Sequence, residues 1–204
     1  ANVVKTVNVV GPEGKSPLAI VLQAGNYQRA TQLVTLGADI NLTLDDGMPG
    51  LVEACQNHDE TLFDFLVSQK ADVNCTAPDG TTCLDLAWER GDGALRAKLF
   101  AAGASVPEEK AKAWFQQAVE AEDYDLASEM IARRLIVPPL SLDGRPLTIQ
   151  AVQSNDPKML EFALHHGGSP SDVGSQDKSA LDLAVDAGSW NLLSLLIEAQ
   201  RPDQ

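Results

Sequence analysis

The chain has few aromatic side chains, few cysteines and no long apolar run, and each of these shortages limits the structures and functions to be expected. Aromatic residues are 5% of its 204 residues, and the three tryptophans are too few and too separated to form a ligand cage. Three cysteines leave at least one thiol unpaired. No apolar run approaches the roughly 18 residues that a membrane-spanning helix needs, so membrane insertion is not expected.

Positive charge is scarce as well. Fifteen Lys and Arg stand against 29 Asp and Glu, which gives a formal net charge of −14. A field of this sign repels phosphate backbones, so nucleic acid is not an expected partner. No Lys or Arg lies between Arg29 and Lys70, whereas seven carboxylates do. If this negative field attracts a partner, the partner is a basic protein. The alternative is that the carboxylates form a solvated face that keeps the chain soluble.

What the chain does have is a repeat of about 33 residues. Spacings of 33, 31, 33 and 33 residues separate Ala54, Ala87, Ala118, Ala151 and Ala184, and Val21 has the same phase one repeat earlier. Around each anchor a turn, a short apolar helix, a second turn and a longer apolar helix recur. Because two such helices cannot bury their apolar faces alone, neighbouring copies are expected to stack into a solenoid.

The first repeat carries clear start and stop signals. Ser16 precedes Pro17, a good pair for the cap and first position of a helix. Gly25 ends this short helix, and the Gly-Ala-Asp-Ile-Asn segment at 37–41 ends the longer one. Residues 1–10 are rich in β-branched side chains, which predicts a short N-terminal strand or a capping segment.

These motifs resemble the ankyrin repeat. The likeness rests on Ser16-Pro17-Leu18, Gly37-Ala38-Asp39-Ile40-Asn41, Ala71-Asp72-Val73-Asn74, Thr82-Cys83-Leu84-Asp85, Gly103-Ala104 and Ser179-Ala180-Leu181-Asp182. It implies an all-α fold, an ankyrin-repeat solenoid of stacked helix-turn-helix units with short β-turn fingers. A single domain is expected over residues 1–204. Its repeats are expected at about 11–43, 44–76, 77–107, 108–140, 141–173 and 174–204.

The fourth and fifth repeats depart from the family pattern. The fourth is two residues short, lacks the turn glycine and has Arg134 in place of the helix-ending glycine. Its finger, residues 106–112, is therefore expected to differ. In the fifth repeat Pro146 fits either of two registers. The family's turn histidine is absent, so some hydrogen bonds between repeats are expected to be made differently; its place is taken by Ala19, Val52, Asp85, Gln116, Ile149 and Asp182.

No motif predicts catalysis, a cofactor or a metal site. Segment 11–16 looks like the end of a phosphate-binding loop, but Val9 stands where the first glycine of that loop belongs. His165 and His166 end a second helix, with no cysteine or carboxylate at a recognisable zinc spacing.

We interpret the cysteines and two of the asparagines as residues with structural roles. Cys55 is expected in the core. Cys75 and Cys83 flank a finger turn, and they either form a disulfide in an oxidising compartment or remain two small side chains. Asn41 and Asn74 begin glycosylation motifs but belong to the helix-ending pattern, so these matches are expected to be accidental.

The family usually binds partners through its concave surface of fingers and first helices, and the likeness assigns binding residues by position. They are Asp45, Asp46, Met48, Gln56, Asn57, Pro78, Asp79, Thr81, Glu89, Arg90, Glu109, Lys110, Lys112, Glu120, Leu142, Asp143, Arg145, Gln153 and Ser154. Trp88 replaces a small residue and either fills a gap or protrudes. Trp190 either caps the stack or anchors a partner.

The expected function is non-catalytic protein binding. The likeness allows an inhibitor or immunity-type protein that neutralises a partner enzyme, such as a secreted or cell-wall hydrolase. A general adaptor that joins two proteins is the alternative, and nucleotide binding at Lys15 is a remote one. The chain starts at Ala1 rather than Met, which fits removal of a secretory signal or trimming. Export to a bacterial periplasm is favoured over the cytoplasm.

Overall fold

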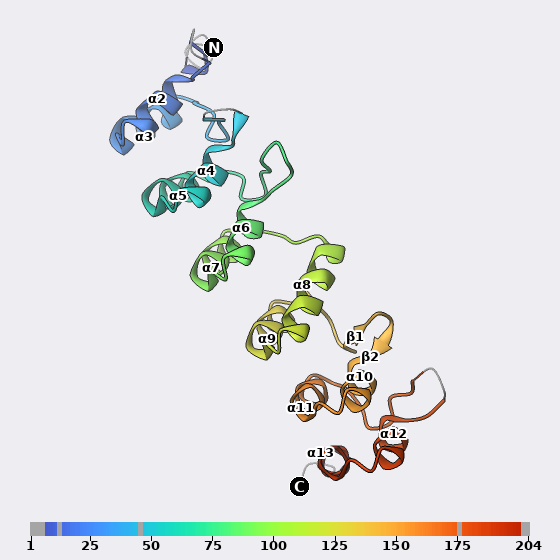
Figure 1. Cartoon of the computed structure of the whole chain (residues 1–204). Coiled ribbons are helices and arrows are strands. Elements are labelled where there is room, and N and C mark those ends of the chain that lie inside the picture. Colours follow the sequence, from blue (N-terminus) through green and yellow to red (C-terminus); the bar gives the residue numbers. More distant parts are fainter. Residues whose placement is uncertain (1–6, 12–13, 45–46, 175–176, 201–204) are drawn as a thin grey trace. The chain divides into compact units, whose positions relative to one another are not determined.

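The computed structural model describes residues 7–11, 14–44, 47–174 and 177–200. Contacts divide the chain into two compact units, Ala1–Ser105 and Val106–Gln204, and the prediction of a single domain stays a prediction. Twelve helices lie in the described residues, in pairs that follow the repeats (Figure 1). This confirms the predicted helical repeat fold. None of these helices is both long and apolar enough to cross a membrane.

The first unit consists of three helical hairpins. They are α2 (Pro17–Gln23) with α3 (Tyr27–Thr35), α4 (Gly50–Gln56) with α5 (Glu60–Ser68), and α6 (Cys83–Glu89) with α7 (Gly93–Ala101). Ser16 caps α2, and Pro17 is at its first position. Thr82 and Asp85 form a capping box at α6. Each second helix begins after a side chain that accepts a backbone N–H of the first turn, from Asn26, Asp59 or Asp92.

The second unit contains the other three hairpins. They are α8 (Glu108–Glu120) with α9 (Tyr124–Ala132), α10 (Leu147–Gln153) with α11 (Pro157–His165), and α12 (Ala180–Asp186) with α13 (Trp190–Ala199). The finger before α10 is a β-hairpin of β1 (Ser141–Leu142) and β2 (Arg145–Pro146). Pro146 is the N-cap of α10, one position earlier than Pro17 in its own repeat, and this settles the register that the sequence left open.

A left-handed backbone residue recurs with the repeat and confirms its period. Between the two helices of each hairpin, φ is positive at Gly25, His58, Gly91, Glu122, Asn155 and Gly188. The five anchor alanines are 3% exposed or less. Val21, which has the same phase in the first repeat, is only half-buried.

The core of each unit is a row of apolar layers between neighbouring hairpins. In the second unit, one cluster joins the fifth and sixth repeats through Ile149, Ala151, Val152, Leu160, Ala180, Ala184, Leu192 and Leu196. Small anchors let adjacent first helices approach, and the branched side chains fill the space behind them.

Asparagine side chains link the N-terminal segment to the first repeat, and successive repeats to one another, in the first unit. Each accepts a hydrogen bond from a backbone N–H 31 positions later: Asn8 from Asp39 at 2.8 Å, Asn41 from Asp72 at 2.7 Å and Asn74 from Ser105 at 2.8 Å. Bonds between repeats are therefore made without the family's histidine, as predicted. Whether the glycosylation motifs at Asn41 and Asn74 are accidental stays a prediction.

The N-terminal segment caps the first hairpin. Val7 is helical and buried, and Asn8 lies in a turn. The Asn8 side-chain amide also donates to the carbonyl oxygen of Gly37 at 2.9 Å. The strand alternative is therefore wrong for residues 7–10, and the capping alternative holds there. The rest of the predicted segment, residues 1–6, lies outside the described residues.

Candidate functional site

The candidate site lies in the second unit, where the repeat pattern is interrupted. α8 has 13 residues, whereas α2, α4, α6, α10 and α12 have seven each. The additional residues of α8 occupy the positions at which the other repeats have a finger turn. This confirms the prediction that residues 106–112 differ from the other fingers.

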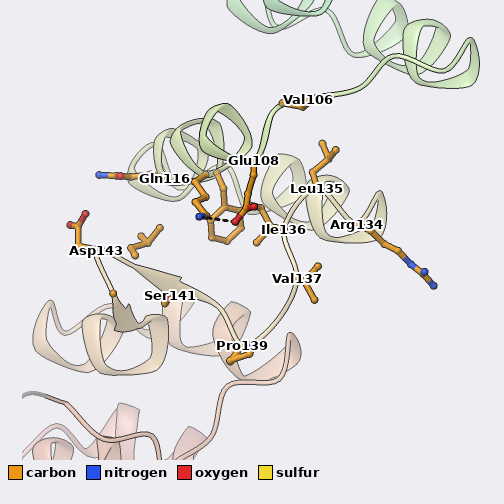
Figure 2. A pocket seen from close by; sticks show the side chains of 14 residues that line it. Val106, Glu108, Gln116, Arg134, Leu135, Ile136, Val137, Pro139, Ser141 and Asp143 are labelled. Atoms are coloured by element: carbon orange, nitrogen blue, oxygen red, sulfur yellow. Dashed lines mark ion pairs between the residues drawn. The ribbon is translucent and has the colours of Figure 1, made fainter.

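The chain that leaves α9 forms one wall of the site. Arg134 has a φ of 58°. The N–H groups of Arg134 and Leu135 donate to the carbonyl oxygens of Ile131 at 2.9 Å and Met130 at 3.0 Å. These are the two bonds of a Schellman helix end, with arginine at the position that usually holds glycine. Residues 135–139 then lead away from the helix toward the hairpin (Figure 2).

The hairpin of β1 and β2 forms a second wall. Asp143 and Gly144 have φ values of 52° and 73°, as a two-residue type I′ turn requires. Leu142 pairs with Arg145 across this turn. An Asp-Gly pair favours such a turn because both residues tolerate the left-handed conformation. The finger is consequently fixed in shape by its own sequence.

Two hydrogen bonds hold the hairpin against α10. The N–H of Leu147 donates to the carbonyl oxygen of Leu140 at 2.9 Å. Gln150 Nε2 donates to the carbonyl oxygen of Leu142 at 2.6 Å. Leu140 and Leu142 are both buried, so the hairpin is attached to the rigid helix by packing as well as by hydrogen bonds.

Between these walls and α8 is an open groove of about 800 Å³ (Figure 2). Its apolar lining comes from Val106, Phe115, Leu135, Ile136, Val137, Pro139 and Leu142. Phe115 is 2% exposed, whereas Val137 is 71% exposed. Exposed apolar side chains next to polar ones are typical of binding surfaces.

The charged groups of the groove balance one another. Glu108 Oε1 lies 2.8 Å from Lys112 Nζ, and Glu109 Oε1 lies 3.3 Å from the same nitrogen. The hydrogen bond to Lys112 lowers the pKa of Glu108, and the one to Glu108 raises the pKa of Lys112. Asp143 and Arg134 lie at opposite ends of the groove in Figure 2. The lining thus has two carboxylates and two cations in a chain whose net charge is −14.

The lining of the groove contains several kinds of polar group beside its apolar side chains. It offers apolar, carboxylate, ammonium, guanidinium, amide and hydroxyl groups, and none of its residues is histidine or cysteine. Across the described part of the chain, no group of three or more His, Cys, Asp or Glu is placed to hold a metal ion.

A second hollow, of about 440 Å³, lies on the surface formed by α9 and α11. Ser128 Oγ is 3.3 Å from His166 Nε2, and the ring centroids of His166 and Phe162 are 4.7 Å apart. Burial, with a further effect of His165, lowers the pKa of His166. This histidine is therefore packed against its neighbours and stays neutral more readily than an exposed one.

Three predicted partner-binding residues line the groove: Lys112, Leu142 and Asp143. The Leu142 side chain is only 8% exposed, so it supports the groove wall from the core of the unit. The predicted residues next to these in sequence are Glu109, Lys110 and Arg145. The structure thus brings together part of the prediction made for the fourth and fifth repeats.

The remaining predicted residues lie elsewhere. Those in the first unit are Met48, Gln56, Asn57, Pro78, Asp79, Thr81, Trp88, Glu89 and Arg90, and those in the second unit outside the groove lining are Glu120, Gln153, Ser154 and Trp190. Asp45 and Asp46 lie outside the described residues. Arg90 donates to the carbonyl oxygens of Cys55 at 2.7 Å and Gln56 at 3.2 Å, so it connects two repeats.

Trp88 and Trp190 have different surroundings. Trp88 is half-buried, and the guanidinium of Arg96 lies 5.2 Å from its ring centroid. This arrangement favours the gap-filling alternative. Trp190 is 81% exposed, which favours the anchor alternative over a cap.

The cysteines are free thiols. Cys55 and Cys83 are buried and Cys75 is half-buried, which confirms the core position of Cys55. The Cys83 thiol donates to the carbonyl oxygen of Leu51 at 3.3 Å, and no disulfide joins it to Cys75 in this structure. Burial, followed by the charge of Asp72, raises the pKa of Cys75 to about 11.

Two residues of the segment considered for nucleotide binding make hydrogen bonds within the first repeat. Lys15 Nζ donates to Gln23 Oε1 at 2.9 Å. Ser16 Oγ accepts from the N–H of Ala19 at 3.2 Å, which makes it the cap of α2. Pro12 and Glu13 of the same segment lie outside the described residues.

Most of the groove was missed from the sequence. Its central wall, residues 135–139, lies where the family pattern is interrupted and offers no consensus position to match. A signal was present: the run Leu-Ile-Val-Pro-Pro-Leu at 135–140 is apolar but has two prolines, which exclude a helix interior or a central strand. An apolar run that can join neither element must pack as a loop or remain exposed.

Comparisons with known proteins point to one kind of protein. No protein-family profile matches the chain. It is 24% identical over 199 residues to YahD of Escherichia coli (strain K12), described as an ankyrin repeat protein, and the match covers 95% of this chain and 84% of YahD.

Similar solved structures are also ankyrin repeat domains, each 21% identical to this chain. The domain from Acinetobacter baumannii AYE has a TM-score of 0.42, with 95% of this chain and 85% of that one covered. The domain of Bcl-3 has a TM-score of 0.48, with 93% and 88% covered. The domain of human ASB11 has a TM-score of 0.45, with 93% and 100% covered.

Proposed function

We propose, from the premise that the chain is an ankyrin-repeat protein and thus a protein-binding module, that its second unit binds a polypeptide partner in the groove. The observation that carries this proposal is the open volume of about 800 Å³, with apolar side chains such as Val137 exposed beside charged ones. Repeat proteins bind partners through extended surfaces built by successive repeats. The groove is lined by elements of two successive repeats.

The finer part of the proposal is that the partner is an enzyme and that binding inhibits it. A stoichiometric inhibitor needs a shaped, fixed surface and no chemistry of its own, and the groove supplies such a surface. The net charge of −14 favours a basic enzyme, such as a secreted or cell-wall hydrolase, by long-range attraction. Because the groove itself is balanced in charge, the field is expected to act mainly on the association rate.

Two matched variants test the proposal. Val137→Asp places a carboxylate on the groove wall, and Val173→Asp makes the same change outside the groove, at a side chain that is 50% exposed. We expect the tagged chain to capture a basic enzyme that Val173→Asp retains and Val137→Asp loses. Adding equimolar chain should abolish the activity of that enzyme. Equal capture by both variants would refute binding in the groove, and full activity at saturating chain would refute inhibition.

The adaptor alternative is favoured by one observation, the exposure of Trp190. Its ring is 81% exposed at the start of α13, outside the groove lining, and tryptophan is enriched at interface hot spots. An adaptor would lose one partner in Trp190→Ala and a different one in Val137→Asp. Neither partner would change its activity on binding.

A further inference from the structure

The hairpin leaves one edge of β1 without a strand partner among the described residues. Leu142 and Arg145 flank the two-residue turn, so they exchange the backbone hydrogen bonds of the first pair. The next pair is Ser141 with Pro146. It is of the kind without hydrogen bonds, and proline has no N–H to donate. The N–H and C=O of Ser141 therefore point away from β2.

The following pair confirms this alternation. The N–H of Leu147 donates to the carbonyl oxygen of Leu140 at 2.9 Å, so the inward-directed groups belong to Leu140 and Leu142. Ser141 lies between them, is exposed, and lines the groove. One donor and one acceptor are thus presented along the free edge, which is the pattern that an added strand uses.

The rest of the groove suits the side chains of an extended segment. Successive side chains of a strand point to opposite faces. Every second side chain of a segment paired with Ser141 can therefore enter the apolar part of the groove, which includes Phe115, Ile136 and Val137. The intervening side chains face solvent and need no partner.

Charged groups lie near both ends of a segment that is added antiparallel to β1, as β2 is. β1 runs toward Asp143, so an antiparallel segment beside it starts near Asp143 and ends toward the side of Arg134 (Figure 2). A basic residue at the start of the segment then meets the carboxylate of Asp143. A carboxylate at its end lies on the side of the groove that carries the positive charge of Arg134. Opposite charges at its two ends favour this antiparallel segment over an antiparallel one with the charges reversed.

We propose that the groove binds an extended segment of the partner as a third strand paired with Ser141. The segment is apolar at alternate positions, basic at its N-terminal end and acidic at its C-terminal end. This inference rests on the proposed function, because it specifies which part of a partner the groove holds.

The test starts from peptides displayed on phage, selected from a random 12-residue library against the full chain. We expect selected peptides to share the alternating apolar pattern between a basic start and an acidic end. Affinity is then measured with one synthetic selected peptide. Ser141→Pro removes the outward N–H that β2 does not use, and Ser141→Ala removes only the hydroxyl. We expect binding at least about tenfold weaker for Ser141→Pro and within about twofold of wild type for Ser141→Ala.

A second measurement keeps the inference testable if Ser141→Pro does not fold. The peptide is methylated at one backbone nitrogen at a time, and wild-type binding is measured. Strand addition predicts a strong loss at the one amide that donates to the Ser141 carbonyl oxygen and little loss at the amides on either side of it. Unchanged affinity in Ser141→Pro, or similar losses at neighbouring amides, would overturn strand addition. If Val137→Asp still abolishes peptide binding in that case, binding in the groove remains supported. If the selected peptides bind Val137→Asp as they bind wild type, binding in the groove is overturned as well.

Discussion

Gly168, which follows the left-handed end of α11, has no space for a side chain. A Cβ atom there would lie 2.5 Å from Thr148 Cγ2 and 2.8 Å from the carbonyl oxygen of Ala163. Thr148 is 1% exposed, and its Oγ1 donates to Asp172 Oδ2 at 2.6 Å. The same carboxylate oxygen accepts the N–H of Ser169 at 2.8 Å. Displacing Thr148 would therefore disturb a buried network.

We expect Gly168→Ala to lower the free energy of unfolding of the second unit by about 2.5–6 kcal/mol if the hydrogen bond of Thr148 is lost, and by about 1–3 kcal/mol if it is kept. Overpacking a filled site costs about 1–3 kcal/mol, and a weakened hydrogen bond to a carboxylate adds about 1.5–3 kcal/mol if it is lost. The assay is urea denaturation of the full chain, with hydrogen exchange read by mass spectrometry to assign the loss to a unit.

Gly50→Ala provides the matched control. A Cβ at Gly50 would lie 3.5 Å from its nearest neighbour, Leu44 Cδ1, which is an ordinary contact. Gly50 is the first residue of α4, so alanine there should be neutral or stabilise by up to about 1 kcal/mol. Equal stabilities for Gly168→Ala and Gly50→Ala would refute the packing described for Gly168.

Three further predictions concern single residues. Lys70 has a φ of 65°, so Lys70→Gly should stabilise the first unit by about 1 kcal/mol in thermal or urea denaturation, whereas Gln69→Gly, at a φ of −86°, should not. Burial, followed by His165, lowers the pKa of His166. The neutral His166 ring should therefore stabilise the fold above about pH 6.5, and this stabilisation should disappear as the pH falls through the folded-state pKa. A proton NMR titration of that ring with a midpoint at or above about 6.5 would contradict this. Burial and then Asp156 raise the pKa of Tyr124 to about 12, so ultraviolet titration should show a phenol that ionises late, and earlier in Asp156→Asn.

Much of the fold could be predicted because stacking restricts the residue at each anchor. Ala54 and Ala151 are 1% and 0% exposed, and only small side chains fit where first helices approach, so the period is visible in the sequence. Left-handed positions were predictable where glycine holds them. His58 and Asn155 have φ values of 54° but give no such signal, because their residue types are common in other conformations.

The candidate site was less predictable because it depends on the failure of the repeat pattern. Family positions led to Lys112 and Asp143, which do line the groove. They gave no indication of Val137 or Ser141, which belong to a segment without a consensus. The turn at Asp143 was readable from Asp-Gly, but the outward direction of the Ser141 backbone depends on strand register, which only the structure defines.

Binding in the groove is tested most directly by NMR titration of the nitrogen-15-labelled full chain with a selected peptide. The predicted result is saturable shifts of the Val137 and Ser141 amide resonances, with slower hydrogen exchange of the Ser141 amide in the complex. Shifts centred on Trp190 or on residues of the first unit, with Ser141 exchange unchanged, would contradict both the groove and the added strand.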